Sequence, residues 1–247
     1  MPKSYKITIA EYFDPHTVSA KPVSLTRQLT IPGTVPGPET TIRKAVSSIS
    51  FDDFRTFEIQ HEYQVNMWGR SFEDGRQFSS FIARGEIRAY HSSTRGVLLL
   101  SGKKADIIDF CKQSQTASAL KLETIQLDMK ALQQKLPEIR GVWFRFKTGY
   151  IRAKAYMGQQ IQDTTEFSDA NVEGDISTLS FYFEDARDGC MHPLMITEDG
   201  AVVLQKNYKS IEDEIDFVLH VKTELLDSLF TRVDPTKVRG HVSMVEG

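Results

Sequence analysis

The sequence has little of what marks several special classes of protein. Its 247 residues include two cysteines, Cys111 and Cys190, which lie in no CxxC pairing. Because so few cysteines cannot build a disulfide framework, we predict that both are reduced thiols, with Cys111 in a core. The chain has no apolar run of about 18 residues, the length that crosses a bilayer, and its N-terminus lacks the apolar stretch of a signal peptide. We therefore expect a cytoplasmic protein without membrane contacts.

Residue patterns for metal and nucleotide chemistry are also missing. The six histidines are scattered, with no HxxxH pair and no Cys/His cluster at zinc spacing, so we expect no metal and no cofactor. Residues 97–104 end in two lysines after Ser101-Gly102 but lack the spacing of a phosphate-binding P-loop. These absences favour a protein without catalytic residues. The acidic turns around Asp188 and Glu198-Asp199 leave a metal-dependent nuclease or hydrolase as an alternative.

The composition that is present is average for a globular protein. Hydrophobic residues make up 40% of the chain and charged residues 26%, with 33 acids, 30 bases and a net charge of -3. These values exclude a disordered or collagenous chain. The length allows one large domain or two small ones.

Residues 1–95 are predicted to form a β-rich N-terminal part. Alternation places Tyr5, Ile7 and Ile9 on one face of a first strand. Three prolines within residues 31–38 forbid a helix and predict a loop. Further strands are predicted at residues 57–68 and 78–90.

After residue 95, predicted helices alternate with predicted strands. The apolar run at 97–100 is typical of a buried strand, and Asp128 and Ser210 are predicted helix N-caps. Strands are predicted at 122–127, 142–147, 150–157, 177–184, 193–197 and 201–205, and helices at 103–113, 128–136 and 211–230. We therefore predict an α+β fold whose mixed or antiparallel sheet has helices packed on one face. Residues 96–235 would form a ferredoxin-like part and residues 236–247 a flexible tail.

Charge is spread unevenly along the chain. Residues 140–160 contain five basic residues and no acid, whereas residues 161–220 contain fourteen acids and three bases. Such asymmetry points to a binding surface more than the overall charge does.

The basic block has the spacing of a β-hairpin at residues 142–157. If Thr148-Gly149 forms the turn, Arg145 lies opposite Arg152, and like charges in that position cost stability unless an anion neutralises them. One predicted face then places cations between aromatic side chains, the combination that follows a phosphate backbone and stacks bases. The residues of this predicted face are Trp143, Arg145, Lys147, Arg152, Lys154 and Tyr156, and Ser180 and Tyr182 of a later strand offer an extension.

An opposing interpretation gives the same cations a purely structural environment. In it, acids from residues 161–220 cover them in a solvated network of little energetic value. The partners predicted by this interpretation are Glu166, Glu173, Glu184 and Asp185.

A second basic stretch, residues 70–104, contains seven bases and three acids. Its last two bases stand where a strand passes into a helix, and free N–H groups at a helix N-terminus attract anions. The residues that we assign from it to the predicted nucleic-acid surface are Arg84, Arg88, Arg95, Lys103 and Lys104.

The sequence thus predicts a non-enzymatic binding module that contacts nucleic acid or another polyanion inside a larger assembly. One alternative is a protein-interaction or homo-oligomerising subunit that uses the acidic surface of residues 161–220 and the terminal helix. The other is the metal-dependent nuclease or hydrolase.

Overall fold

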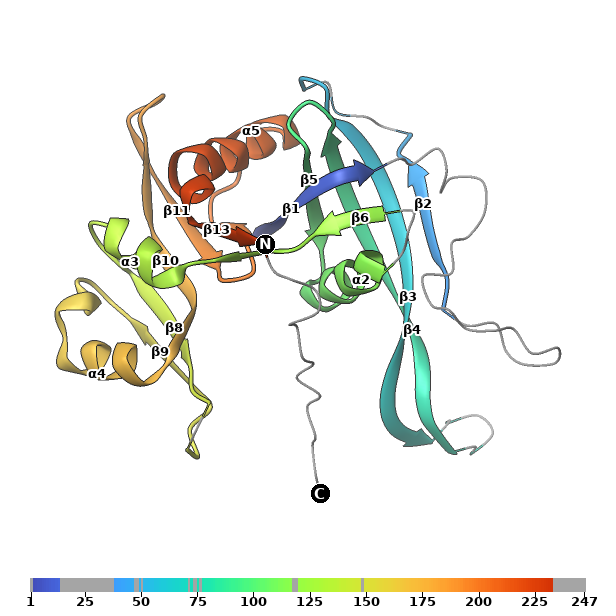
Figure 1. Cartoon of the computed structure of the whole chain (residues 1–247), viewed down its shortest axis with the longest axis horizontal. Coiled ribbons are helices and arrows are strands. Elements are labelled where there is room, and N and C mark those ends of the chain that lie inside the picture. Colours follow the sequence, from blue (N-terminus) through green and yellow to red (C-terminus); the bar gives the residue numbers. More distant parts are fainter. Residues whose placement is uncertain are drawn as a thin grey trace.

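A computed structural model describes residues 2–13, 38–46, 49, 51–70, 72, 75, 77–116, 120–147 and 149–232. These residues form an α+β protein with an antiparallel sheet of eleven strands, a separate two-stranded ribbon and four α-helices (Figure 1). The predicted fold class is confirmed at this level. Most of the predicted loop at 31–38 and all of the predicted tail at 236–247 lie outside the described residues.

The elements follow one another along the chain as strands and helices. The strands are β1 (Lys3–Phe13), β2 (Thr40–Lys44), β3 (Arg55–Arg70), β4 (Gln77–Ser92), β5 (Val97–Gly102), β6 (Leu120–Glu123), β7 (Ile125–Leu127), β8 (Gly141–Arg145), β9 (Ala153–Met157), β10 (Asp175–Asp185), β11 (Cys190–Thr197), β12 (Ala201–Leu204) and β13 (Phe230–Arg232). The helices are α2 (Lys104–Thr116), α3 (Met129–Lys135), α4 (Thr165–Glu173) and α5 (Ile211–Val221). The large sheet has the order β2-β3-β4-β5-β1-β12-β11-β10-β8-β9, with β6 also paired to β1.

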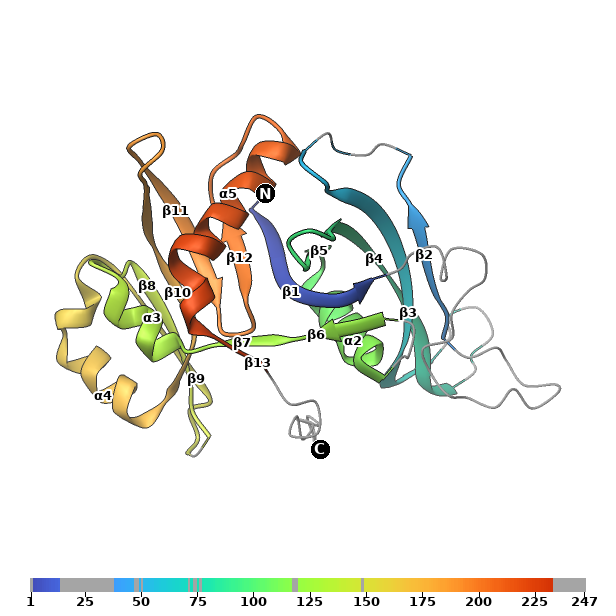
Figure 2. The same ribbon diagram turned by 45° about the horizontal axis from the view of Figure 1, so that its top comes forward.

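Strand β1 joins the two halves of the large sheet. Its residues Lys6–Ile9 pair with β5, and its residues Lys3–Lys6 pair with β12 (Figure 2). Strands from before and after residue 95 therefore share one sheet. The domain boundary at that residue stays a prediction.

Hydrophobic cores lie on both faces of the sheet. Leu99 faces a cluster that includes Ile215 of α5, whereas Leu98 and Leu100 face a cluster that includes Phe110 of α2. The prediction of helices on one face is therefore wrong. The reason is visible in the continuous apolar run at 97–100, because such a run suits a strand that is buried on both faces.

The predicted helix starts are confirmed by their hydrogen bonds. The Asp128 carboxylate accepts from the backbone N–H groups of Lys130 and Ala131, and the Ser210 hydroxyl accepts from that of Asp213. Helix α5 continues through a π-helical turn (Lys222–Leu226) and a 3₁₀ turn (Asp227–Leu229), close to the predicted end at 230. Its apolar stripe is buried in the core.

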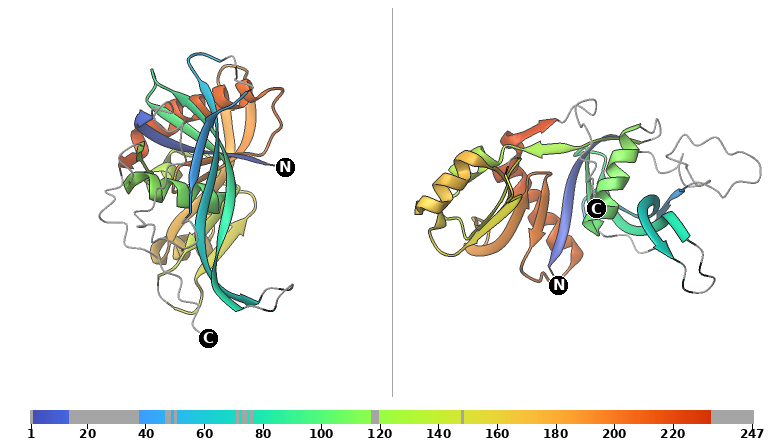
Figure 3. Two further views of the ribbon diagram at one scale, coloured as in Figure 1. Left: turned by 90° about the vertical axis from the view of Figure 1, so that its right-hand side faces the viewer. Right: turned by 90° about the horizontal axis from the view of Figure 1, so that it is seen from below.

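Strands β3 and β4 form a long hairpin that extends beyond the rest of the sheet (Figure 3). Neighbouring strand β2 pairs only with residues 57–61 of β3, and β5 only with residues 87–92 of β4. Trp68, on the outer part of this hairpin, is 79% exposed.

The structure also bears on the predicted state of the cysteines and on membrane-spanning helices. Cys111 and Cys190 are both free thiols, and burial raises the pKa of the Cys111 thiol to about 11, as befits a core residue. No helix of the described part is long and apolar enough to span a bilayer.

Candidate binding surface

Five strands at one end of the sheet, β9-β8-β10-β11-β12, have one face packed against the core and one face with exposed or partly exposed side chains. Val142 and Phe144 point into the core that contains Phe167 of α4, so Trp143 and Arg145 project from the other side. We call this other side the open face. The strand registers place on it Gly141, Trp143, Arg145, Ala153, Ala155, Met157, Asp175, Thr178, Ser180, Tyr182, Glu184, Met191, Pro193, Met195, Thr197 and Val203.

The indole ring of Trp143 reaches over Gly141 on this face. A Cβ atom built on Gly141 would be 3.2 Å and 3.3 Å from two atoms of that ring and 3.2 Å from the Ser180 Cβ. The ring therefore covers Gly141 beside Ser180, because the glycine has no side chain in the way. Trp143 is partly exposed.

Tyr182 is a second aromatic residue on the open face, as its place on the polar side of a predicted strand suggested. It is 41% exposed, and the Arg140 guanidinium carbon lies 5.6 Å from the centre of its ring. Arg140 also donates to Glu138 at 2.9 Å. Sequence reasoning counted Arg140 as a basic residue but did not place it at the site.

The predicted hairpin face is split between the two sides of the sheet. Arg145 pairs with Ala153 and Phe144 with Lys154, so seven residues, 146–152, separate the first pair. The predicted turns had an even number of residues and would have placed Lys154 and Tyr156 on the face of Trp143. An odd number of residues between the paired strands places them on the opposite face. The prediction that Lys154 and Tyr156 share a face with Trp143 and Arg145 is therefore wrong.

Lys154 and Tyr156 have partners on the packed side. The ring of Tyr156 meets the ring of Phe144 edge-on at 6.0 Å, and the Lys154 ammonium lies 5.3 Å from the centre of the Phe146 ring. Both side chains therefore belong to the rim of the core.

Acids do pair with two of the remaining predicted cations, as the opposing interpretation requires, but different acids from those expected. Arg145 forms an ion pair with Glu198, and Lys147 forms one with Asp175 at 2.7 Å. Asp185, one of the expected partners, is instead bound by Arg187. Ion pairs near the surface contribute about 0–1 kcal/mol, so neither carboxylate holds its cation strongly.

The turn that joins β8 to β9 presents further exposed groups. Arg152 donates to the carbonyl oxygen of Lys147 at 2.9 Å, and Tyr150 and Ile151 next to it are exposed. Sequence reasoning missed these two side chains because it placed residues 150–157 in a strand.

A polar hollow of about 730 Å³ adjoins Arg140 at one end of β8. Gln159, Gln160 and Gln162 contribute to its lining. Gln160 has a positive φ of 50°. A non-glycine residue adopts this conformation only at a cost in free energy, and such residues are often found at functional sites.

Arg84, Arg88 and Arg95 of the second predicted basic stretch do not join the open face. Arg84 and Arg88 lie opposite Glu62 and Glu58 in the β3–β4 pairing, on the other face of the sheet, and Arg95 pairs with Asp52 at 2.8 Å. Lys103 and Lys104 are exposed where α2 begins. Lys104 also lines a hollow with Thr197 and Val203, on the side of the sheet that carries Met195. Whether any of them meets nucleic acid stays a prediction.

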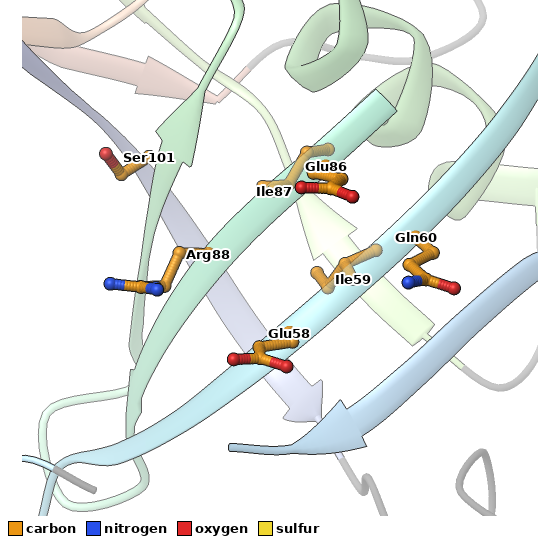
Figure 4. A pocket seen from close by; sticks show the side chains of 7 residues that line it. All are labelled: Glu58, Ile59, Gln60, Glu86, Ile87, Arg88 and Ser101. Atoms are coloured by element: carbon orange, nitrogen blue, oxygen red, sulfur yellow. The ribbon is translucent and has the colours of Figure 1, made fainter. Parts of the chain in front are cut away.

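The face that carries Arg88 is slightly hollowed. The hollow has a volume of about 320 Å³. Figure 4 shows the charged and polar side chains of Glu58, Glu86, Arg88 and Ser101 that line it. None of the seven residues that line it is a histidine or cysteine.

Two histidine clusters lie in the body of the protein. His61 bonds Thr40 at 2.8 Å and Asp109 at 3.0 Å, in the order of a nucleophile–base–acid triad. Thr40 is only 2% exposed and His61 is fully buried, so both side chains lie inside the protein.

The second cluster joins Asp185, Asp188 and His192, whose ligand atoms lie within 4.8 Å of one another. Hydrogen bonds from the Arg187 guanidinium lower the pKa of Asp185 to about 2, and His220 lies 3.3 Å from the same carboxylate. Arg187 thus already supplies the positive charge that a metal ion would bring. The nuclease alternative stays a prediction for this cluster.

Comparison of the sequence with models of known protein families and with curated proteins found no match.

Proposed function

We propose that this protein is a non-enzymatic module that binds single-stranded nucleic acid on the open face. The observation that carries the proposal is the pair of partly exposed rings, Trp143 and Tyr182, each on a strand of the open face with an arginine nearby. Antiparallel sheets that bind RNA use aromatic rings in this way, with helices on the opposite face. Protein rings that stack on bases contribute about 1–3 kcal/mol per base.

The spacing of the two rings suits consecutive unpaired bases. The Trp143 ring lies beside Ser180, and Tyr182 is the next residue of β10 on the same face. Two residues of a strand cover about 7 Å, a distance that an extended single strand can match. The bases of a duplex are already stacked on one another and cannot lie flat on such rings.

The charge of the open face sets the expected salt dependence. Arg140 and Arg145 are its arginines, and each is in a weak pair with a glutamate. Two phosphate contacts predict that the logarithm of the association constant falls with the logarithm of salt concentration with a slope of about -1.4. With a net charge of -3 there is no strong long-range attraction.

The hollow beside Arg140 supplies hydrogen-bonding groups for a base edge. Glutamine amides donate and accept at once, which suits the edges of bases that have left a stack. Gln159 and Gln160 are exposed at this place.

The proposal keeps two finer predictions from the sequence. One is the ferredoxin-like description of residues 96–235, which is supported by the core between Phe144 of β8 and Phe167 of α4 on the side away from the open face. The other is the cytoplasmic location.

The test is fluorescence anisotropy with labelled single-stranded and double-stranded RNA and DNA of mixed sequence at two salt concentrations. We expect binding to single strands that weakens with salt as stated. Equal binding to duplexes, or no binding to any probe at low salt, would contradict the proposal.

A further inference from the structure

Strand β9 leaves one edge of the large sheet unpaired. It is the last strand in the sheet order, and β8 is its only strand partner in the described part of the chain. Unpaired edges are templates for another strand, so proteins usually block them with prolines, bulges or charges. Residues 153–157, Ala-Lys-Ala-Tyr-Met, contain no proline and one charge.

The backbone groups of this edge can be assigned from the pairs that bracket it. Phe146 donates to the Arg152 carbonyl at 3.0 Å, and Gly158 donates to the Arg140 carbonyl at 3.1 Å. Hydrogen-bonded and non-hydrogen-bonded pairs alternate along an antiparallel ladder. The N–H and C=O groups of Ala153, Ala155 and Met157 therefore point away from β8.

The side chains of the same three residues leave room for a second strand. Ala153 and Ala155 are small and exposed, and Met157 is 69% exposed. The one charged side chain, Lys154, lies over the ring of Phe146 on the other side of the sheet.

We propose that β9 pairs with β9 of a second copy of this chain, antiparallel and centred on Ala155. In this register Ala155 lies opposite its own copy and Ala153 lies opposite Met157, so the three residues with outward backbone groups meet one another. Lys154 lies opposite Tyr156, and no like charges face each other. Moving the centre to Lys154 would place two lysines opposite each other, which is unfavourable.

The self-complementary register is what selects a second copy as the occupant. A two-fold axis through Ala155 makes the same patch serve both chains, as in most homodimers. Because a five-residue edge is smaller than a stable interface requires, the dimer forms only at high concentration. The inference does not depend on nucleic-acid binding, and pairing would place two open faces side by side in one continuous sheet.

Cysteine cross-linking tests the register directly. In a Cys190→Ser background, which removes the exposed native thiol, Ala155→Cys places two thiols opposite each other at the axis. A hydrogen-bonded antiparallel pair has Cα atoms about 5.5 Å apart, within disulfide reach. We expect mild oxidation to give a covalent dimer of twice 28.1 kDa. The matched variant Ala153→Cys in the same background should cross-link at least ten times more slowly.

Sedimentation velocity of the unmodified protein gives an independent result. We expect its mass to rise with concentration, and we expect Ala155→Pro to remain a monomer, since proline removes an outward N–H that has no partner in β8. Lys44→Pro, on the edge strand β2 at the opposite end of the sheet, should behave like the wild type. A monomer at every concentration, or equal cross-linking at residues 153 and 155, would overturn the proposal.

Discussion

The side chain of Asp106 occupies the space in which a side chain on Gly85 would lie. A Cβ atom on Gly85 would be 2.3 Å from Asp106 Cγ, and Asp106 in turn accepts a hydrogen bond from the Tyr63 hydroxyl at 2.9 Å. This contact packs helix α2 against the β3–β4 hairpin next to the residues at which the pairing of the hairpin with β2 and β5 ends. Gly85 is thus required by packing, with an ordinary backbone conformation.

Replacing Gly85 by alanine tests that contact. Because the new methyl group must displace a buried carboxylate, we expect Gly85→Ala to lower the free energy of unfolding by about 1–3 kcal/mol, measured by urea denaturation. Asp106→Ala opens the space, so the double variant should lose less stability than the sum of the two single variants. Additive losses would show that the two residues do not compete for this space.

The ion pair of Asp185 predicts how stability depends on acid pH. Hydrogen bonds from Arg187 lower the pKa of Asp185 to about 2, below its ordinary value of 3.8. The folded state therefore releases this proton more readily than the unfolded state, and the stabilisation is present above pH 4 and disappears as the pH falls through 2. Asp185→Asn should show a shallower loss of unfolding free energy between pH 5 and pH 2 than the wild type.

Asp169→Asn, which removes an exposed acid from α4, is the control for this titration. Its unfolding free energy should follow the wild-type curve. An Asp185→Asn curve that also follows the wild type would mean that the contact with Arg187 does not stabilise the fold.

The two tryptophans of the chain provide a matched pair for the stacking role. Trp143→Ala removes a ring from the open face, so we expect single-strand affinity to fall by about 1–3 kcal/mol, or roughly 5- to 150-fold. Trp68→Ala removes an even more exposed ring from the β3–β4 hairpin and should leave affinity unchanged. Anisotropy titrations of both variants, with circular dichroism to confirm folding, decide between a specific platform and general adhesion through aromatic residues.

We expect no metal-dependent catalysis at the cluster of Asp185, Asp188 and His192. Arg187 already binds the central carboxylate, so added Mg²⁺ or Mn²⁺ should produce no cleavage of a labelled single-stranded oligonucleotide. Metal-stimulated cleavage that Asp188→Asn abolishes would instead support the nuclease alternative.

Local features of the fold could be predicted from the sequence because their causes are local. The caps at Asp128 and Ser210, the turn at Gly200 with its positive φ of 78°, and the buried strand at 97–100 each depend on a few neighbouring residues. The apolar run at 97–100 also indicates that helices pack on both faces of the sheet, although the prediction placed them on one face.

The candidate site was only partly predictable, because its faces depend on the register of β8 and β9. The register follows from whether the number of residues in the turn is odd or even, and the sequence Lys-Thr-Gly-Tyr allowed either. Tyr182 and Trp143 were placed correctly because they lie on strands whose alternation is clear. The predicted faces of Lys154 and Tyr156 are wrong because the observed pairing differs by one residue from the predicted pairing. Partners such as Glu198 are distant in sequence from Arg145, and no local pattern identifies them.

The most direct test of the open face compares two cations from one hairpin on opposite sides of the sheet. Arg145→Gln and Lys154→Gln each remove one positive charge from exposed side chains nine residues apart. If single strands lie on the open face, Arg145→Gln weakens binding several-fold and reduces the steepness of the salt slope by about 0.7, the contribution of one phosphate contact. Lys154→Gln then matches the wild type. Equal effects of the two substitutions, or a larger effect of Lys154→Gln, would contradict the account.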